Sequence, residues 1–240
     1  MEATLTVAIP TMDRWDHFLK DQLRVYLEHP RVECVIISDE NGNDLEKISE
    51  SEFSMDPKLR LYQNDSVLGV YGNKRQCLLR ASTNWVAVLD SDNQFQPEFF
   101  NAFFSAAERD CDKKTIYCAG QNVRYLMDRG MTEDRTCHFS GMRISRENWN
   151  RVIEMPSWNF LLNDGNAIWP REVVKHFPDM PEEKIAGTDS VFFMRQAVQA
   201  GYTLCVEPAM RYIHTVHDGS HWLQNEQHNS KMLANMFLRI

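Results

Sequence analysis

Three features are missing from this 240-residue sequence, and each absence excludes a class of protein. No apolar run approaches the roughly 20 residues that a membrane-spanning helix needs. The first residues, Met1 to Thr4, lack the basic and apolar segments of a secretory signal. The six cysteines contain no C-x-x-C pair. We therefore expect reduced, mostly buried thiols, no disulfide framework and a cytoplasmic location.

An excess of basic residues is also missing. The net charge is −8 at pH 7, whereas a protein that coats nucleic acid needs clustered Lys and Arg, so we expect no nucleic-acid partner. An acidic protein that handles a phosphorylated ligand needs a local basic patch or a bridging metal ion. Hydrophobic residues make up 43% and charged residues 25% of the chain, which is typical of a folded globular protein rather than a disordered one.

The first half alternates short apolar runs with helical patterns. Strands are expected at 5–9, 32–37, 59–62 and 85–89, and helices at 15–27, at 72–81 and from Pro97 onward. The uninterrupted run 85–89 is typical of a strand that is buried on both faces of a parallel sheet. This alternation predicts an α/β fold with a doubly wound, mostly parallel central sheet flanked by helices. In such sheets, ligands bind beyond the carboxyl ends of the strands.

The second half is less regular, and the segment 121–149 gives few clear signals. The expected elements are a strand at 116–119, a loop with exposed aromatic residues at 155–160, helices at 171–176, 188–200 and 225–240, and two separate strands at 202–206 and 210–213. The chain shows no internal repeat and no low-complexity linker. We therefore expect one domain with an irregular C-terminal half.

The segment Asp90-Ser91-Asp92-Asn93 directly follows the expected buried strand. Two carboxylates at positions i and i+2 beyond a strand end can point to the same place. Such oxygen ligands suit Mg²⁺ or Mn²⁺, which take further ligands from phosphates. The alternative is a turn that caps the helix beginning at Pro97, since Asp, Ser and Asn are common in turns and N-caps.

Upstream of that motif, residues 68–75 (LGVYGNKR) combine a glycine-containing helix start with two adjacent cations, Lys74 and Arg75. A helix N-terminus attracts phosphate, so this segment supplies the basic patch that an acidic protein otherwise lacks. The alternative is a solvated helix start with surface Lys and Arg side chains.

Six segments between about residue 5 and residue 217 resemble, in order and spacing, the motifs of family 2 glycosyltransferases with the GT-A fold. They are 7–14 with P-T-x-N-R, Asp39 with D-D-G-S-x-D, 69–75 with G-x-x-x-A-R-N, 85–93 with the strand leading into D-x-D-D, 164–173 with G-N-x-x-x-x-R-x-x, and 187–202 with E-D-x-x-x-x-x-R-x-x-x-x-G-Y. Two departures are the replacement of the usual Ala-Arg by Asn73-Lys74, and Thr188 in place of an acidic residue.

The resemblance implies a GT-A-type catalytic domain over 1–240, with a nucleotide-binding half at 1–110 and an acceptor and catalytic half at 111–240. Its activity would be metal-dependent transfer of a sugar from a UDP- or GDP-sugar to an acceptor hydroxyl, with inversion. The acceptor would be a glycan, a glycoprotein or a lipid-linked sugar. Peripheral contact with a membrane and a homodimer are both open, because the stretch 232–240 suggests an interfacial helix, core packing or a dimer contact.

The resemblance also assigns roles to single residues. The residues implied to contact the nucleotide sugar are Thr11, Arg14, Asp39, Lys74, Arg75, Asp90 and Asn166. Mn²⁺ or Mg²⁺ would bridge the diphosphate, with Asp92 and Asp90 as ligands and His214 or His217 as a further one. Asp189 would be the general base that takes the proton of the acceptor hydroxyl. Its alternative role is that of a first-turn carboxylate favoured by the helix dipole.

Other interpretations remain open at this stage. Trp158, Asn159 and Trp222 are candidates for stacking on a sugar. His214, His217 and His221 have the spacing of a zinc site on one helix face, although Asp218-Gly219 should break that helix. A non-catalytic sugar- or nucleotide-binding module would keep the fold without turnover. A sugar-1-phosphate nucleotidyltransferase would need a G-x-G-T-R loop, and this chain has PTMDR at 10–14 instead.

Overall fold

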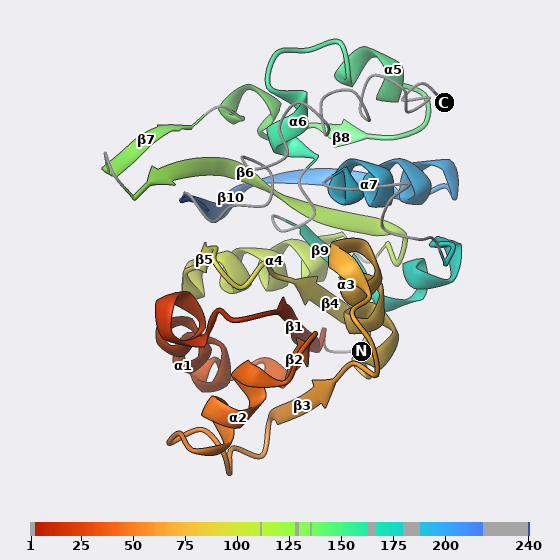
Figure 1. The fold of residues 1–240 in the computed structure, drawn as a ribbon. Helices are drawn as coiled ribbons and strands as arrows, with labels where there is room; N and C mark the ends of the chain where they lie inside the picture. The colour runs from red at the N-terminus through yellow and green to blue at the C-terminus, as the bar shows by residue number, and fades with distance from the viewer. Residues whose placement is uncertain are drawn as a thin grey trace.

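A computed structural model describes residues 3–110, 112–127, 130–134, 136–162, 167–179, 188–217 and 240. In the first half, the elements are β1 (Leu5–Thr11), the π-helical turn η1 (Trp15–Leu19), α1 (Lys20–Glu28), β2 (Val32–Asp39), α2 (Asn43–Ser49), β3 (Leu59–Gln63), α3 (Gly69–Arg80), β4 (Trp85–Val88), β5 (Gln94–Phe95) and α4 (Pro97–Arg109) (Figure 1). In the second half they are β6 (Thr115–Leu126), β7 (Gly130–Asp134), the 3₁₀ turn η2 (Cys137–Phe139), β8 (Arg143–Ile144), α5 (Trp149–Val152), α6 (Trp158–Leu161), β9 (Ala167–Pro170), the 3₁₀ turn η4 (Arg171–His176), α7 (Asp189–Gln199) and β10 (Thr203–Val216).

The strands form one sheet in the order β3-β2-β1-β4-β9-β6-β10-β5, with β7 paired to β6 and β8 paired to β10. Six strands on this path run in the same direction, because β1, β2, β3 and β4 are mutually parallel and β6 is parallel to β10. Only β9, which is antiparallel to both β4 and β6, and β5 run the other way. The predicted mostly parallel α/β sheet is confirmed, and strands from both halves of the sequence build it.

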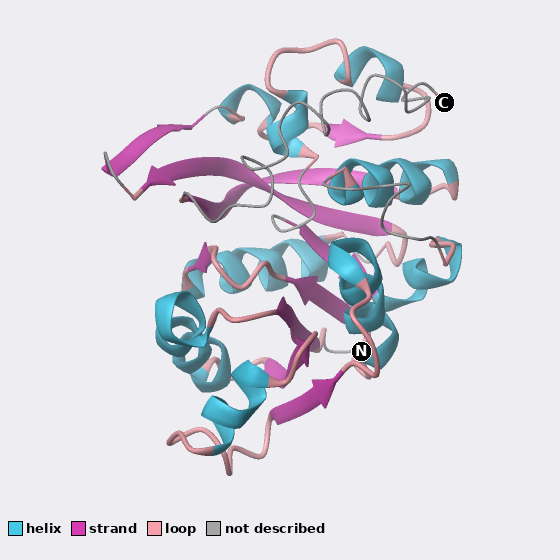
Figure 2. Ribbon diagram, viewed as in Figure 1, coloured by secondary structure: helices cyan, strands magenta, loops and turns pink. Residues whose placement is uncertain are grey.

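Both faces of the sheet are covered, as the uninterrupted apolar strands predict. Along β1, Val7 and Ile9 join the core that contains α1 and α4, whereas Ala8 joins the core that contains α3 and α7. Helices accordingly lie on both sides of the sheet (Figure 2). This arrangement leaves the strand ends as the places where polar side chains can meet.

Helix α4 shows how its local sequence determines its position. Pro97 occupies the first turn, where its missing N–H costs nothing. Four phenylalanines at positions i, i+1, i+4 and i+5 then form one buried face of the helix, and they are Phe99, Phe100, Phe103 and Phe104. The burial of each such side chain stabilises the fold by about 2 kcal/mol, so packing fixes this helix against the sheet.

The sequence predicts two strands at 202–206 and 210–213, but the structure has a single strand there, β10. Its pairing with β6 shifts register between Glu207 and Arg211, which accommodates Pro208, a residue with no main-chain donor. Gly120 of β6 faces this irregularity. A Cβ atom at Gly120 would lie 2.6 Å from the carbonyl oxygen of Glu207, so only glycine lets the two strands approach here.

Other expectations need correction. Residues 155–160 are not a loop with exposed aromatics, because Trp158 begins α6 and packs partly buried against the core. Helix α2 is an additional element, which the sequence analysis does not predict. The expected helix at 225–240 lies outside the described residues except for Ile240. Within the described part of the chain, no helix combines the length and apolar character needed to cross a bilayer.

The described cysteines are all free thiols, as the absence of C-x-x-C pairs predicts. Cys77 and Cys118 are buried, whereas Cys137 is exposed. Burial raises the pKa of the Cys77 thiol to about 12, so this side chain behaves as a small apolar group.

Candidate functional site

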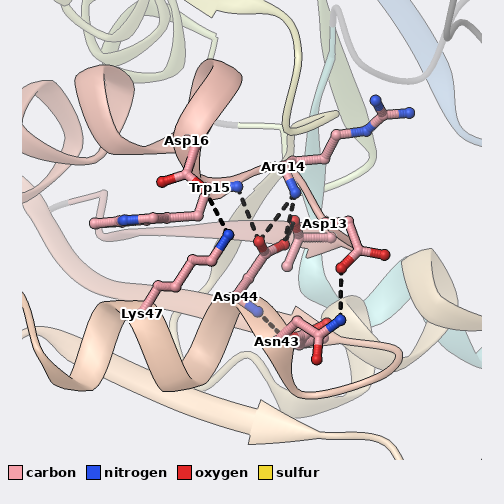
Figure 3. A network of polar contacts seen from close by, with 9 residues as sticks. Asp13, Arg14, Trp15, Asp16, Asn43, Asp44 and Lys47 are labelled. Carbon is pink, nitrogen blue, oxygen red and sulfur yellow. Dashed lines mark hydrogen bonds and ion pairs between the residues drawn. The ribbon is translucent and has the colours of Figure 1, made fainter.

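The loop that follows β1 is organised by a buried carboxylate, Asp44 of α2. The Thr11 hydroxyl donates to Asp44 Oδ2 at 2.5 Å, and the main-chain N–H groups of Arg14 and Trp15 donate to the same carboxylate at 2.9 Å. Figure 3 shows this arrangement, with the Arg14 guanidinium extending away from Asp44. Sequence reasoning assigned no role to Asp44, although it matches the last acid of the D-D-G-S-x-D motif.

Asp39, which the resemblance placed against the nucleotide, is fully buried at the end of β2. Its Oδ1 accepts a hydrogen bond from Asn41 N at 3.2 Å, and its Oδ2 accepts from Asp44 N and Leu45 N at 2.9 and 3.1 Å. Both oxygens therefore hold the start of α2. Thr11 and Asp39 lie together at adjacent strand ends, paired in register, but their observed bonds organise the loops.

The exposed side of the same loops carries Asp13. Its carboxylate accepts hydrogen bonds from the side-chain amides of Asn41 and Asn43 at 3.0 and 2.7 Å, and Figure 3 shows the bond from Asn43. Asp13 has a φ of 58°, in the left-handed region that Asp and Asn tolerate better than most residues. A polar rim thus surrounds the ends of β1 and β2.

The N-terminus of α3, expected to attract phosphate, already holds a carboxylate. Glu40 Oε2 accepts the main-chain N–H of Leu68 at 2.8 Å, and the Gly69 N–H also bonds to Glu40. Burial nevertheless raises the pKa of the Glu40 carboxyl above its ordinary value. The anion that the helix terminus favours is therefore supplied by the chain itself.

Lys74 on α3 joins two carboxylates that are far apart in the sequence. Its Nζ lies 2.8 Å from Asp90 Oδ1, beyond the end of β4, and 2.9 Å from Asp189 Oδ2, in the first turn of α7. The side chains of Lys74 and Asp189 are 6% and 7% exposed, whereas Asp90 keeps 25%. This ion-paired group brings together three residues that the sequence analysis selected separately.

Arg75, the neighbouring cation, is directed elsewhere. Its Nε donates to the carbonyl oxygen of Phe177, at the end of η4, at 2.9 Å. Tyr71 makes a similar tie, since its hydroxyl donates to the carbonyl of Pro178 at 2.6 Å. Of the two adjacent cations, Lys74 is the one that lies at the carboxylates.

The second acid of the motif, Asp92, lies against the end of β10. His217 Nε2 is 3.1 Å from Asp92 Oδ2, and the His217 ring packs on Phe18 with 4.9 Å between ring centroids. Burial by itself would raise the pKa of Asp92, but the hydrogen bond from His217 and the charges of His214, His217 and Arg14 outweigh it, so that pKa is lowered. Asp92 is thus held as a carboxylate, with 22% of its side chain exposed.

His214 lies on β10 close to both acids. Burial lowers the pKa of its imidazole, although the nearby charges of Asp92 and Asp90 act in the opposite direction. Its Nδ1 lies 3.2 Å from the Tyr212 hydroxyl.

Asn93 is a structural residue that the sequence analysis left without a role. Its Oδ1 accepts the main-chain N–H of Thr215 at 2.9 Å, and its Nδ2 lies 3.4 Å from Asp90 Oδ2. The buried amide thus fastens the loop 90–93 to β10. The only signal in the sequence was its place directly after the two acids.

A protein-only metal cluster is not present among the described residues, where no three or more His, Cys, Asp or Glu side chains gather closely enough to hold an ion. Asp90, Asp92, His214 and His217 are neighbours, but Asp90 pairs with Lys74 and Asp92 with His217. Asn166, His221 and Trp222 lie outside the described residues.

A mostly parallel sheet with carboxylates beyond a central strand and at the start of a later helix is the arrangement expected of GT-A-type transferases. The sequence profile of glycosyl transferase family 2 matches residues 6–160. The chain therefore belongs to glycosyl transferase family 2.

Solved structures with a similar fold include TarS 1-349 from S. aureus. This chain superposes on it with a TM-score of 0.67 at 14% identity, covering 97% of this chain and 66% of that one. The complex of TarS 1-349 with UDP-GlcNAc gives a TM-score of 0.66 at 13% identity, covering 91% and 60%. The complex with UDP gives 0.66 at 14%, covering 97% and 66%. The chain thus spans less than two thirds of these TarS chains. No curated protein sequence matches it significantly.

Proposed function

We propose that this chain transfers a sugar from a nucleotide diphosphate sugar to an acceptor hydroxyl, with inversion at the anomeric carbon. The observation that carries the proposal is the bridge from Lys74 to Asp90 and Asp189. This bridge connects two places. One is the strand end where a family 2 enzyme would hold the donor diphosphate, and the other is the carboxylate that would act on the acceptor.

Asp189 is the general base of this proposal. Its carboxylate accepts the proton of the acceptor hydroxyl, the acceptor oxygen forms the new bond to the anomeric carbon, and the bond to the diphosphate breaks with its electron pair leaving on that group. Lys74, held 2.9 Å from Asp189 Oδ2, fixes the orientation of the base. Arg14, whose charge acts on Asp92, places positive charge on the side where the diphosphate would lie.

The two acids of the 90–93 loop also fit a divalent cation. Mg²⁺ is commonly bound by one or two carboxylates together with substrate phosphates, so Asp92 and Asp90 suffice without a third protein ligand. Asp92 is the better candidate, because its pKa is lowered and part of its side chain is exposed. A bound Mg²⁺ or Mn²⁺ would supply Lewis-acid stabilisation of the leaving diphosphate.

The first donor to test is a UDP-sugar, because TarS structures with UDP and UDP-GlcNAc share this fold. We expect the melting temperature of the wild type to rise by roughly 5–10 °C when the nucleotide concentration is about a hundred times its dissociation constant. The panel includes UDP, GDP, CDP and TDP, each with and without Mn²⁺. The shift should require Asp92, so Asp92→Ala should abolish the metal-dependent part.

Turnover is then measured with the donor that binds, as donor hydrolysis and as transfer to a panel of glycan and lipid-linked acceptors. Asp189→Asn should lose about 10²- to 10⁴-fold in turnover and keep nucleotide binding. Asp21→Asn, a change of an exposed acid on α1, serves as the control and should match the wild type. Full turnover in Asp189→Asn would contradict the assigned base.

A non-catalytic module is the alternative that the same assay separates. Thr188, fully buried before Asp189, stands where the family usually has an acid. Nucleotide binding without turnover for any donor would favour the module over the enzyme.

A further inference from the structure

Asn122 on β6 carries a buried side-chain amide whose hydrogen-bonding capacity is unused. The residue is 6% exposed, and neither Oδ1 nor Nδ2 has a hydrogen-bond partner among the described residues. Its main-chain N–H, by contrast, donates to Thr136 Oγ1 at 3.2 Å. A buried polar group without a partner costs about 1–3 kcal/mol, so such a group calls for an explanation beyond packing.

The position of Asn122 places it on a polar face. In the parallel pairing of β6 with β10, Asn122 lies opposite Tyr212 and Arg124 lies opposite His214. Residues paired across parallel strands share a face, as do residues two apart on one strand. These four side chains therefore lie on one face of the strand pair, which we call the β6/β10 polar face. The contact between the Tyr212 hydroxyl and His214 Nδ1 lies on this face.

At the end where Arg124 and His214 pair, this face adjoins both the charged groups of the site and an aromatic ring. Just beyond His214 along the chain, the main-chain N–H of Thr215 donates to Asn93 of the 90–93 loop and His217 Nε2 lies 3.1 Å from Asp92 Oδ2, so the acids of the proposed site lie close to this end of the face. The Arg124 guanidinium lies over the ring of Phe160, 5.2 Å from its centroid. Figure 1 shows α6, which carries Phe160, beside β6.

We propose that Asn122 binds hydroxyl groups of a sugar ring and that the β6/β10 polar face is the sugar subsite beside the catalytic carboxylates. A side-chain amide presents a donor and an acceptor next to each other, which matches two neighbouring hydroxyls of a pyranose. The proposal rests on the function proposed above. The same hydroxyl chemistry is offered by the transferred sugar and by the acceptor sugar.

Thr215 provides a matched control within the same strand pair. Its Oγ1 is also without a partner among the described residues, and the residue is 3% exposed. Because Thr215 follows His214 directly in β10, its side chain projects to the other side of the strand. Thr215 therefore shares the unpaired polar atom and the location with Asn122 but not the face.

The test replaces each group by an apolar one of similar size, in Asn122→Leu and Thr215→Val. Both variants should unfold at higher urea than the wild type, since each removes a buried unpaired polar group. Asn122→Leu should weaken sugar binding about tenfold or more, whereas Thr215→Val should leave it unchanged. Binding of UDP, UDP-GlcNAc and free N-acetylglucosamine is measured by titration calorimetry, and the acceptor KM by transfer assay.

The outcomes are distinct. Weaker UDP-GlcNAc binding with unchanged UDP binding assigns Asn122 to the transferred sugar, and a raised acceptor KM alone assigns it to the acceptor. Unchanged sugar affinity and KM in Asn122→Leu overturn the proposal. If that variant does not fold, Asn122→Thr is measured instead, and wild-type affinity there has the same meaning. Failure of the wild type to bind any nucleotide is a failure of the proposed function, and the free-sugar arm still tests Asn122.

Discussion

Two regions of the site hold their carboxylates in different ways. In the nucleotide-side loops (11–15 and 39–45), Asp39 accepts main-chain N–H groups that lie two to six positions further along the chain. In the charged centre (Lys74, Asp90, Asp92, Asp189 and His217), the acids pair with side chains that lie up to 125 positions away. The bonds of Asp39 are therefore local, those of Asp44 join the two loops across 29 to 33 positions, and the charged centre exists only when still more distant elements meet.

This difference bears on function. A carboxylate whose oxygens already accept three main-chain bonds, such as Asp39, has little capacity left for a ligand. A carboxylate paired with a cationic side chain can exchange that partner for a substrate or a metal ion. We therefore expect the loops to shape the nucleotide site and the charged centre to carry the chemistry.

The largest effect on stability is expected from Lys74→Met. Removing the ammonium leaves Asp189 and Asp90 without their cation, and breaking a buried ion pair costs about 3–5 kcal/mol. The free energy of unfolding from urea titration measures this loss. Lys74→Arg keeps the charge and should retain most of the stability. A loss below about 1 kcal/mol in Lys74→Met would mean that the charged centre does not hold α3 and α7 together.

A somewhat smaller effect is expected from Asp44→Ala. This change leaves the buried donors of Thr11, Arg14 and Trp15 without their acceptor, at about 2–3 kcal/mol in total. Asp13→Asn is the control, because Asp13 is exposed and Asn also tolerates its backbone conformation, so the change should stay within about 0.5 kcal/mol. Equal losses in both variants would remove the distinction between the buried and exposed carboxylates of these loops.

A pH-dependent effect is expected at Glu40. Burial raises the pKa of this carboxyl above 4.5 in the folded state, so the folded protein binds the proton more tightly than the unfolded chain. The contribution of Glu40 to stability therefore falls as the pH rises from about 4.5 through its raised pKa. The urea midpoint of the wild type should accordingly decline over this range relative to Glu40→Gln. Parallel pH profiles would show that the bonds from Leu68 and Gly69 cancel the effect of burial.

No measurable change is expected from Lys47→Ala. Lys47 Nζ lies 2.5 Å from Asp16 Oδ2, but the two side chains are 46% and 60% exposed, and exposed pairs contribute little. Figure 3 shows this pair beside the buried bonds of Asp44. A clear fall in the melting temperature of Lys47→Ala would show that the rim of the loops is more rigid than its exposure indicates.

Local patterns in the sequence predicted much of the first half. Apolar runs identified β1, β2 and β4, because strands covered on both faces are largely apolar, and the short run 59–62 identified the edge strand β3. Pro97 and its phenylalanines identified α4. Asp90 and Asp92 were found because they directly follow a buried strand. Asp44 was missed, although the D-D-G-S-x-D motif contained the signal, because its function depends on main-chain groups from another loop.

The sequence by itself determined the α/β class, the strands β1 to β4 and, apart from Asp44, the acids and cations of the candidate site. The tertiary structure alone decided that Lys74 rather than Arg75 meets Asp90 and Asp189, that His217 pairs with Asp92, and that Asn122 shares a face with His214. The physical reason is the range of the interactions. Periodicity and turn chemistry act over a few residues, whereas the pairings of Lys74 with Asp189 and of Asp92 with His217 join residues 115 and 125 positions apart and depend on how β6, β10, α3 and α7 pack.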